Sequence, residues 1–249
     1  MIPIPQATAA GVLVANLPGA NAQSVAEYVL FALLALSRRF RAIDGDLRAH
    51  GWAAGRAHAD SAQEIAGRTI GIVGPGAVGR AIRDLATAFG LRVLASGRQS
   101  VPLGFEPRPL AALLAESDFV VLCCPLTDAT RNLIGAAELA RMQPHAVLIN
   151  VARGAVVDEA ALVAALRTGK ISGAALDVFA TQPLPPDHAL FGLPNVLLTP
   201  HLAGITEASM RRMGLGAVAE VVRVLAGEAP RHLVNPDALP RFRARFAPA

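Results

Sequence analysis

The chain lacks the features that mark several classes of protein. Its 249 residues include only two cysteines, Cys123 and Cys124, which stand side by side. Adjacent cysteines provide neither a disulfide framework nor the ligand spacing of a metal site. Charged residues make up 17% of the chain, whereas 53% of its residues are hydrophobic. That balance excludes a disordered chain and predicts a sizeable folded core.

Long apolar segments are also missing. The longest charge-free apolar run covers residues 28–36, which is far shorter than the ~20 residues of a membrane-spanning helix. The chain does not open with the basic segment, apolar stretch and small-residue cleavage site of a signal peptide, so we expect none. We therefore expect a cytoplasmic protein with no membrane partner, although the mean hydropathy of +0.43 is high.

Basic charge is present but scattered. The net charge is +4 and the only lysine is Lys170, with a sequence pI of about 10.0. The arginine clusters at residues 38–41 and 241–243 are short. Because nucleic-acid-binding proteins usually gather their charge on one face, we expect no nucleic-acid partner.

Short apolar segments alternate with helical patterns through the middle of the chain. The sequence predicts strands at residues 69–73, 92–95, 119–123, 146–151, 173–176 and 196–199, and helices at 77–89, 109–116, 136–142 and 159–167. The strand segments are apolar throughout, which is typical of a parallel sheet with both faces covered. We therefore expect an α/β fold with a doubly wound parallel sheet of the Rossmann type.

Two further helices bracket this unit. One is predicted at residues 24–39, with Ser24 as its cap and Glu27 at the capping-box position. It is apolar on nearly all sides, so we expect it to be buried between domains or subunits and predict a homodimer. The other is predicted at residues 206–226. Residues 9–16 predict a turn and a single strand.

A glycine-rich loop follows the first strand of the alternating pattern. Gly74, Gly76 and Gly79 have the spacing G-x-G-x-x-G between a strand and a helix. The first glycine permits a tight turn, the second lets the backbone approach a pyrophosphate, and the third lets helix and strand pack closely. The helix N-terminus offers free N–H groups to the phosphates. The sequence therefore predicts a dinucleotide-binding site.

The next strand ends where such domains distinguish NAD from NADP. An acidic residue usually binds the ribose 2′-OH at about this position, but here Gly97 occupies it and Arg98 follows. An acidic side chain would repel a 2′-phosphate, whereas Arg98 and Ser100 can pair with one. The sequence therefore favours NADP as the cofactor, with NAD possible.

Four ordered motifs carry a more specific signal. They read ANLPGANAQSVAE at residues 15–27, NVARGAVVDE at 150–159, GAALDVFATQPLP at 173–185 and LTPHLAG at 198–204. Together they resemble the D-isomer-specific 2-hydroxyacid dehydrogenases, a family that includes phosphoglycerate dehydrogenase and glyoxylate/hydroxypyruvate reductase. The resemblance covers essentially the whole chain. It implies hydride transfer between NADP(H) and a small 2-hydroxy or 2-keto acid, such as glyoxylate or hydroxypyruvate.

The resemblance also implies roles for individual residues. Arg153 would bind the substrate carboxylate, which a guanidinium matches in shape, and would polarise the C2 carbonyl. His201 would be the general acid of the reduction, because an imidazole with a reference pKa of ~6.5 exchanges protons near neutrality. Asp177 would bind the nicotinamide carboxamide, and Arg153 and His201 also border the cofactor. The other implied cofactor contacts are Ala77, Val78, Cys124, Pro125, Val151, Ala152 and Gly204.

Gln182 departs from the family pattern. In most of the family a glutamate stands at this position and pairs with the histidine, and a nearby carboxylate can raise a histidine pKa by ~1–3 units. Gln182 can orient His201 by a hydrogen bond but supplies no charge. We therefore expect a weaker general acid and an acid-shifted pH optimum. Gln182→Glu should raise reductase activity between about pH 7 and 8.

The front of the chain is a second departure. Family members begin with a flavodoxin-like substrate lobe, and on the order of 80–100 residues of it have no counterpart here. We expect residues 1–20 to be a remnant of that lobe, residues 21–205 to be the dinucleotide-binding domain, and residues 206–249 to form a C-terminal helix that returns to the lobe. Two alternatives to an active reductase stay open: a non-catalytic dinucleotide-binding interaction module, and a truncated inactive fragment.

Overall fold

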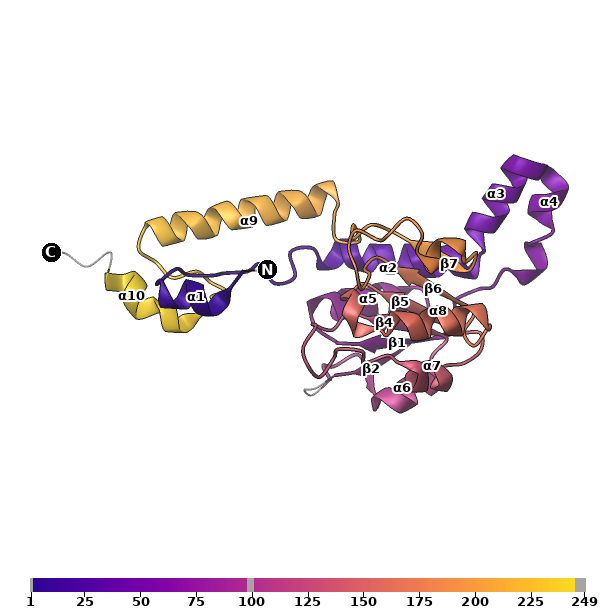
Figure 1. The fold of residues 1–249 in the computed structure, drawn as a ribbon, viewed down its shortest axis with the longest axis horizontal. Coiled ribbons are helices and arrows are strands. Elements are labelled where there is room, and N and C mark those ends of the chain that lie inside the picture. Colours follow the sequence, from indigo (N-terminus) through magenta and orange to yellow (C-terminus); the bar gives the residue numbers. More distant parts are fainter. Residues whose placement is uncertain (1, 98–100, 245–249) are drawn as a thin grey trace. The chain divides into compact units, whose positions relative to one another are not determined.

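The computed structural model describes residues 2–97 and 101–244 (Figure 1). The chain divides into two units, one of residues 22–204 and one of residues 1–21 with 205–249. The larger unit contains the sheet and most of the helices, and the smaller unit joins the two ends of the chain. None of the helices in the described residues has the length and apolarity to cross a membrane.

The larger unit is built on a seven-stranded, entirely parallel sheet. Its strands are β1 (Thr69–Val73), β2 (Arg92–Ser96), β3 (Glu106–Pro107), β4 (Phe119–Leu122), β5 (Val147–Asn150), β6 (Gly173–Leu176) and β7 (Val196–Leu198). Their order in the sheet is β3-β2-β1-β4-β5-β6-β7. This confirms the predicted fold class, a doubly wound parallel sheet of the Rossmann type. The strand order reverses between β1 and β4, which is where such sheets bind ligands.

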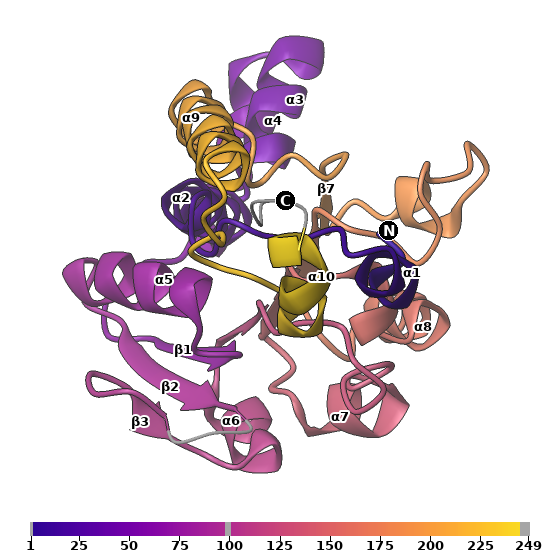
Figure 2. The same ribbon diagram turned by 90° about the vertical axis from the view of Figure 1, so that its left-hand side faces the viewer.

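Helices cover both faces of the sheet (Figure 2). Residues of β4 alternate between two hydrophobic clusters, because successive side chains of a strand point to opposite faces. Val120 and Leu122 join the cluster formed with α6 (Leu110–Glu116), α7 (Ala136–Arg141) and α8 (Glu159–Arg167). Phe119 and Val121 join the cluster formed with α2 (Ala22–Ser37) and α5 (Ala77–Ala88). Each face of the sheet therefore has its own core.

Helix α2 differs from its prediction in two respects. It begins at Ala22, and Ser24 is buried inside it, so the prediction that Ser24 caps the helix is wrong. The apolar faces of α2 are largely covered within its own unit, where Val29 and Leu33 are fully buried in the cluster with α5 and the sheet. Phe31, by contrast, is 51% exposed. Packing within its own unit therefore accounts for the apolar composition of α2 apart from Phe31.

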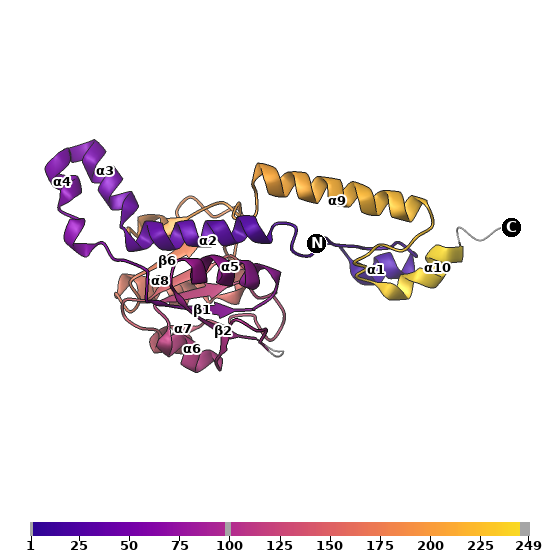
Figure 3. The same cartoon turned by 180° about the vertical axis from the view of Figure 1, so that it is seen from behind.

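A helical hairpin between α2 and β1 escaped prediction. It consists of α3 (Phe40–His50) and α4 (Trp52–Arg56), and we call residues 40–56 the helical arm (Figures 1 and 3). Helix α3 has no buried residue. Phe40, Leu47 and Trp52 are exposed, Trp52 to 75% of its surface. Phe40, Ile43 and Leu47 stand at the i, i+3, i+7 spacing of an amphipathic helix, so a signal for α3 was present in the sequence.

The smaller unit contains α1 (Ile4–Ala9), α9 (Glu207–Leu225) and α10 (Leu239–Ala244). The prediction of a strand within residues 9–16 is wrong, because this stretch forms only an isolated antiparallel bridge between Ala15 and Leu233. The Asn235 side chain accepts a hydrogen bond from Val14 N at 2.8 Å and donates one to Val12 O at 3.0 Å. A side chain thus satisfies the backbone groups that a neighbouring strand would otherwise pair with.

Candidate active site

The glycine loop packs too tightly for side chains at two of its three glycines. Gly74 has φ +99°, and a Cβ there would lie 2.7 Å from the Cα and N of Cys124. A Cβ on Gly79 would lie 2.7 Å from Gly74 O. Gly76, in contrast, has nothing within 4 Å of its Cβ position. The first and third glycines are therefore required for packing, and the second leaves an open approach to the backbone.

Helix α5 begins directly after this loop, at Ala77. Gly76 precedes it, and no side chain caps its start. The first-turn amides of Ala77 and Val78 can therefore bind an anion at the positive end of the helix dipole. This arrangement fits a dinucleotide pyrophosphate, because the open side of Gly76 lies next to those amides.

The position expected to contact the adenosine ribose is also constrained. A Cβ on Gly97 would lie 2.9 Å from Pro75 Cδ, which belongs to a rigid ring. An acidic side chain would require that ring to move. Arg98 and Ser100, the residues expected to pair with a 2′-phosphate, lie outside the described residues.

The two cysteines follow β4 and face the glycine loop. Cys123 Sγ donates a hydrogen bond to Gly74 O at 3.0 Å, and Cys124 is buried. Desolvation raises the pKa of both thiols, so both stay protonated and poorly reactive. Pro125, the next residue, is held by Thr130 Oγ1, which donates to its carbonyl oxygen at 2.7 Å. The cysteines here act as packing residues beside the crevice.

Arg153 lies in a loop that its neighbours hold in place. Asn150 is 1% exposed at the end of β5, and its side chain accepts from Ala152 N at 3.0 Å and donates to Arg153 O at 3.1 Å. A Cβ on Gly154 would lie 1.9 Å from the carbonyl carbon of Phe179. The backbone of Arg153 is thus fixed on both sides, while its side chain is exposed.

Asp177, at the end of β6, orders the loop that carries His201. Its carboxylate accepts hydrogen bonds from Thr199 Oγ1 at 2.7 Å, Leu202 N at 2.8 Å and Ala203 N at 2.9 Å. Its backbone carbonyl accepts one from His201 N at 2.8 Å. His201 has φ +57°, a left-handed conformation that non-glycine residues seldom adopt. These contacts hold His201 in that conformation, and the expected contact of Asp177 with nicotinamide stays a prediction.

Gln182 contacts the ring of His201. The imidazole Nδ1 and the amide Oε1 are 3.1 Å apart, and both side chains are exposed. An amide oxygen can only accept a hydrogen bond, so in this arrangement Nδ1 carries the proton. In the neutral ring, Nε2 is then an acceptor.

Tyr28 was missed as a contributor to this site. Its hydroxyl lies 2.6 Å from Thr199 Oγ1, which in turn donates to Asp177. Burial raises the pKa of Tyr28 to about 12, so the hydroxyl stays protonated. A lone tyrosine within an apolar helix was the available signal. The Tyr28 side chain thus connects α2 to the loop that carries His201.

The topology brings the expected residues to one edge of the sheet. Arg153, Asp177 and His201 follow β5, β6 and β7, which are neighbours in the sheet. Val151 and Ala152 follow β5, and Gly204 ends the loop after β7. The glycine loop and Cys124 follow β1 and β4 at the same carboxyl edge. Among the described residues, no group of three or more His, Cys, Asp or Glu side chains could hold a metal ion.

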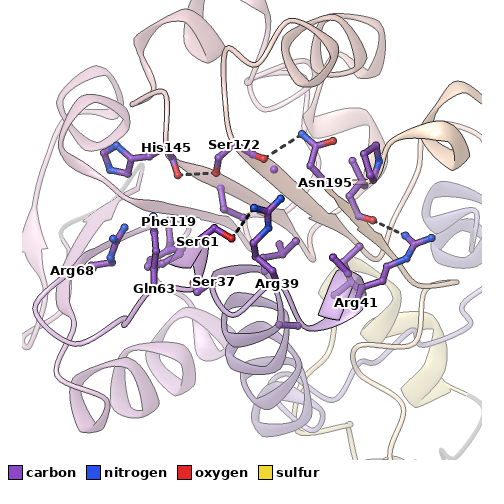
Figure 4. A pocket seen from close by; sticks show the side chains of 18 residues that line it. Ser37, Arg39, Arg41, Ser61, Gln63, Arg68, Phe119, His145, Ser172 and Asn195 are labelled. Atoms are coloured by element: carbon purple, nitrogen blue, oxygen red, sulfur yellow. Dashed lines mark hydrogen bonds between the residues drawn. The ribbon is translucent and has the colours of Figure 1, made fainter. Parts of the chain in front are cut away.

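Two cavities open on the larger unit at opposite edges of the sheet. One, of about 630 Å³, is lined by Gln182 and His201 together with apolar side chains that include Phe179, Leu184 and Phe191. The other, of about 430 Å³, lies at the amino ends of the strands and contains none of the expected site residues (Figure 4). Its polar lining includes Arg39, Arg41, Arg68 and His145.

The sheet order and the glycine loop at its reversal point define a Rossmann-type dinucleotide-binding domain. Residues 30–203 match the family described as "D-isomer specific 2-hydroxyacid dehydrogenase, NAD binding domain". The chain therefore belongs to the D-isomer-specific 2-hydroxyacid dehydrogenase family, which confirms the resemblance of its four motifs.

Three relatives illustrate the match. Glyoxylate reductase of Aeropyrum pernix is 40% identical over 238 residues, which cover 92% of this chain and 71% of that protein. The NADPH-dependent glyoxylate/hydroxypyruvate reductase of Sinorhizobium meliloti, solved with NADP and malonate, is 32% identical with a TM-score of 0.83, covering 95% and 74%. An acyclic imino acid reductase, solved with NADPH and D-Arg, is 28% identical with a TM-score of 0.86, covering 94% and 74%. The chain thus spans about three quarters of these proteins.

Proposed function

We propose that the chain is an oxidoreductase that transfers a hydride between NADP(H) and a small 2-hydroxy or 2-keto acid, such as glyoxylate or hydroxypyruvate. One observation carries the proposal. Arg153 and His201 follow strands at the same sheet edge as the glycine loop, in a chain 40% identical to a glyoxylate reductase. A binding module without turnover has no use for an arginine and a histidine placed in this way.

The residues of the larger unit divide the work between cofactor and substrate. The open backbone at Gly76 and the first-turn amides of α5 fit the pyrophosphate of a dinucleotide, which supplies the hydride when bound. The guanidinium of Arg153 binds the substrate carboxylate through two parallel hydrogen bonds. His201 gives the C2 oxygen its proton during reduction and removes it during oxidation.

NADP is the proposed cofactor. An acidic side chain at Gly97, of the kind that binds an unphosphorylated ribose, would require the ring of Pro75 to move. Two of the solved relatives contain NADP or NADPH. We expect NADPH to bind more tightly than NADH, as measured by fluorescence titration, and equal affinities would contradict this assignment.

The same proposal bears on the cellular location of the enzyme and on the role of its smaller unit. A cytoplasmic location fits a reductase whose thiols, Cys123 and Cys124, are free and stay protonated. The smaller unit, formed by residues 1–21 with 205–249, is proposed to belong to a substrate lobe.

A homodimer is also proposed, because the helical arm exposes large apolar side chains. The helical arm exposes Phe40, Leu47 and Trp52, while α3 buries none of its residues. A second copy of the chain would cover these side chains. We expect light scattering at micromolar concentration to give a dimer, and Trp52→Ser to shift the protein toward the monomer. A wild-type monomer would refute this part of the proposal.

The activity itself is tested by following NADPH fluorescence as protein and then hydroxypyruvate are added. Loss of signal that begins only with the keto acid is the expected result. Arg153→Gln and His201→Asn should each slow that loss strongly. His232→Asn is the matched control, because His232 lies in the smaller unit and in none of the motifs. A fluorescence change on adding protein that then stays constant would instead favour cofactor binding without turnover.

A further inference from the structure

We propose that this site reduces 2-iminio acids, the condensation products of 2-keto acids with ammonia or a primary amine, in preference to the 2-keto acids themselves. The inference rests on the proposed function, because it uses the same cofactor and the same carboxylate contact at Arg153. What it adds is the kind of bond that is reduced. Hydride adds to the carbon of a C=N bond in place of the carbon of a C=O bond. Gln182 is the positioning residue that sets this preference.

His201 differs from three other histidines of the chain in the partner of its ring. His58 lies 2.6 Å from Asp46, His145 lies 2.7 Å from Asp118, and His188 lies 3.1 Å from Glu159. Each of these imidazoles thus contacts a carboxylate. The described ring partner of His201 is the amide oxygen of Gln182, at 3.1 Å.

The carboxylate of Asp177 already accepts hydrogen bonds from the loop that carries His201. Asp177 accepts hydrogen bonds from Thr199, Leu202 and Ala203 through its two oxygens, and it meets His201 only through its backbone carbonyl. Within the described residues, no salt bridge to His201 is formed. The imidazole is therefore held in position by an amide oxygen, without a counter-charge.

The neutral ring presents an acceptor to the substrate. Because Gln182 Oε1 accepts from Nδ1, the unprotonated nitrogen of the neutral ring is Nε2. A keto oxygen needs a donor at this point, since hydride arrival at C2 must be matched by a proton on oxygen. An iminium nitrogen carries its own N–H and donates it to Nε2. Its positive charge would be repelled by an imidazolium but not by a neutral imidazole.

The reaction balances without a proton from the enzyme. The 2-keto acid and the amine condense in solution, losing water and taking up one proton to form the iminium. Hydride from NADPH adds to C2, the C=N π electrons move to nitrogen, and the product is a neutral amine that solvent then protonates. NADPH is oxidised to NADP⁺ and the iminium carbon is reduced. Arg153 holds the carboxylate throughout.

A small substituent on nitrogen also has room. The cavity of about 630 Å³ beside Gln182 and His201 is lined by Phe179, Leu184 and Phe191. Apolar walls beside His201 favour an alkyl group over a hydroxyl. Methylamine is therefore a suitable test amine.

The test supplies the 249-residue chain with NADPH and glyoxylate at one pH near neutrality, with and without methylamine, and quantifies glycolate and N-methylglycine by mass spectrometry. We expect N-methylglycine to exceed glycolate by about tenfold or more, corrected for the concentrations of iminium and aldehyde. Gln182→Glu should lower this product ratio by about tenfold, because a carboxylate beside the ring favours the charged form, which donates to a keto oxygen and repels an iminium. Gln63→Glu is the matched control, because it adds the same charge away from the site and should leave the ratio unchanged.

The outcomes separate the inference from the proposed function. Glycolate without N-methylglycine would overturn the iminium preference and leave the keto-acid reductase intact. An unchanged product ratio in Gln182→Glu would overturn the role of Gln182. Neither product from wild type or variant would refute the reductase itself, and the preference with it.

Discussion

Asp177→Asn tests whether a single carboxylate organises the loop that carries His201. Asp177 is 2% exposed, and its carboxylate accepts three hydrogen bonds of 2.7 to 2.9 Å from residues 199–203. Asparagine has nearly the same shape, so the substitution leaves no cavity. It does replace one acceptor oxygen by an NH₂ group, which then faces a donor.

The size of the effect follows from these contacts. Hydrogen bonds to a charged group contribute about 1.5–3 kcal/mol each, and a buried donor left unpaired costs a further 1–3 kcal/mol, roughly. Loss of one such bond therefore lowers the free energy of unfolding by about 3 kcal/mol. That is a large share of the total stability of a typical domain, about 5–15 kcal/mol. The left-handed backbone of His201 loses its support at the same time, so turnover should fall as well.

Urea unfolding followed by circular dichroism measures the first effect. The matched control is Asp187→Asn, which removes the same charge from an exposed position and should change stability by less than about 0.5 kcal/mol. An Asp177→Asn variant that unfolds at the same urea concentration as the wild type would show that the carboxylate does not hold the loop together.

Three further predictions concern other parts of the structure. Gly154→Ala should destabilise the protein by about 3 kcal/mol, because the new Cβ would lie 1.9 Å from the Phe179 backbone; Gly45→Ala, with nothing within 4 Å, is the control, and equal melting temperatures would contradict the packing. Gly76→Ala should leave the melting temperature unchanged, because its Cβ meets open space, but should weaken NADPH binding by about tenfold, or 1.4 kcal/mol; unchanged affinity would mean that the cofactor does not approach there. Absorbance titration of Tyr28, the only tyrosine, should give a pKa of about 12. Because the folded state holds that proton more tightly than the unfolded chain, this contribution to stability is constant below about pH 10 and is lost between about pH 10 and 12; a titration near 10 in the folded protein would refute the burial.

Much of the larger unit could be predicted from local patterns. The buried strands β1, β4, β5 and β6 are continuous apolar segments, and their alternation with helices specifies a parallel sheet. Gly74 and Gly79 were recognisable because only glycine fits where backbones approach so closely. The neighbouring positions of Arg153 and His201 followed from the rule that parallel strands end at the same edge.

The parts that escaped prediction depend on contacts between distant residues or on unburied surface. The bond from Asn235 to the backbone around Val14 spans more than two hundred residues, and it replaces the strand pairing that an apolar segment suggests. Helix α3 of the helical arm buries no residue, and its apolar positions Phe40, Ile43 and Leu47 follow a helical period that was overlooked. Tyr28 meets Thr199 only because α2 folds back onto the sheet.

Deuteride transfer tests the central claim most directly. The protein is incubated with glyoxylate and NADPH that carries deuterium at the transferable C4 position, and the glycolate formed is analysed by mass spectrometry. We expect one deuterium at C2 of glycolate from the wild type, and at least about a hundredfold less labelled product from Arg153→Gln, which loses a bidentate contact worth about 3 kcal/mol. No labelled glycolate from the wild type, or equal labelling by the two proteins, would contradict hydride transfer to a carboxylate-anchored substrate at this site.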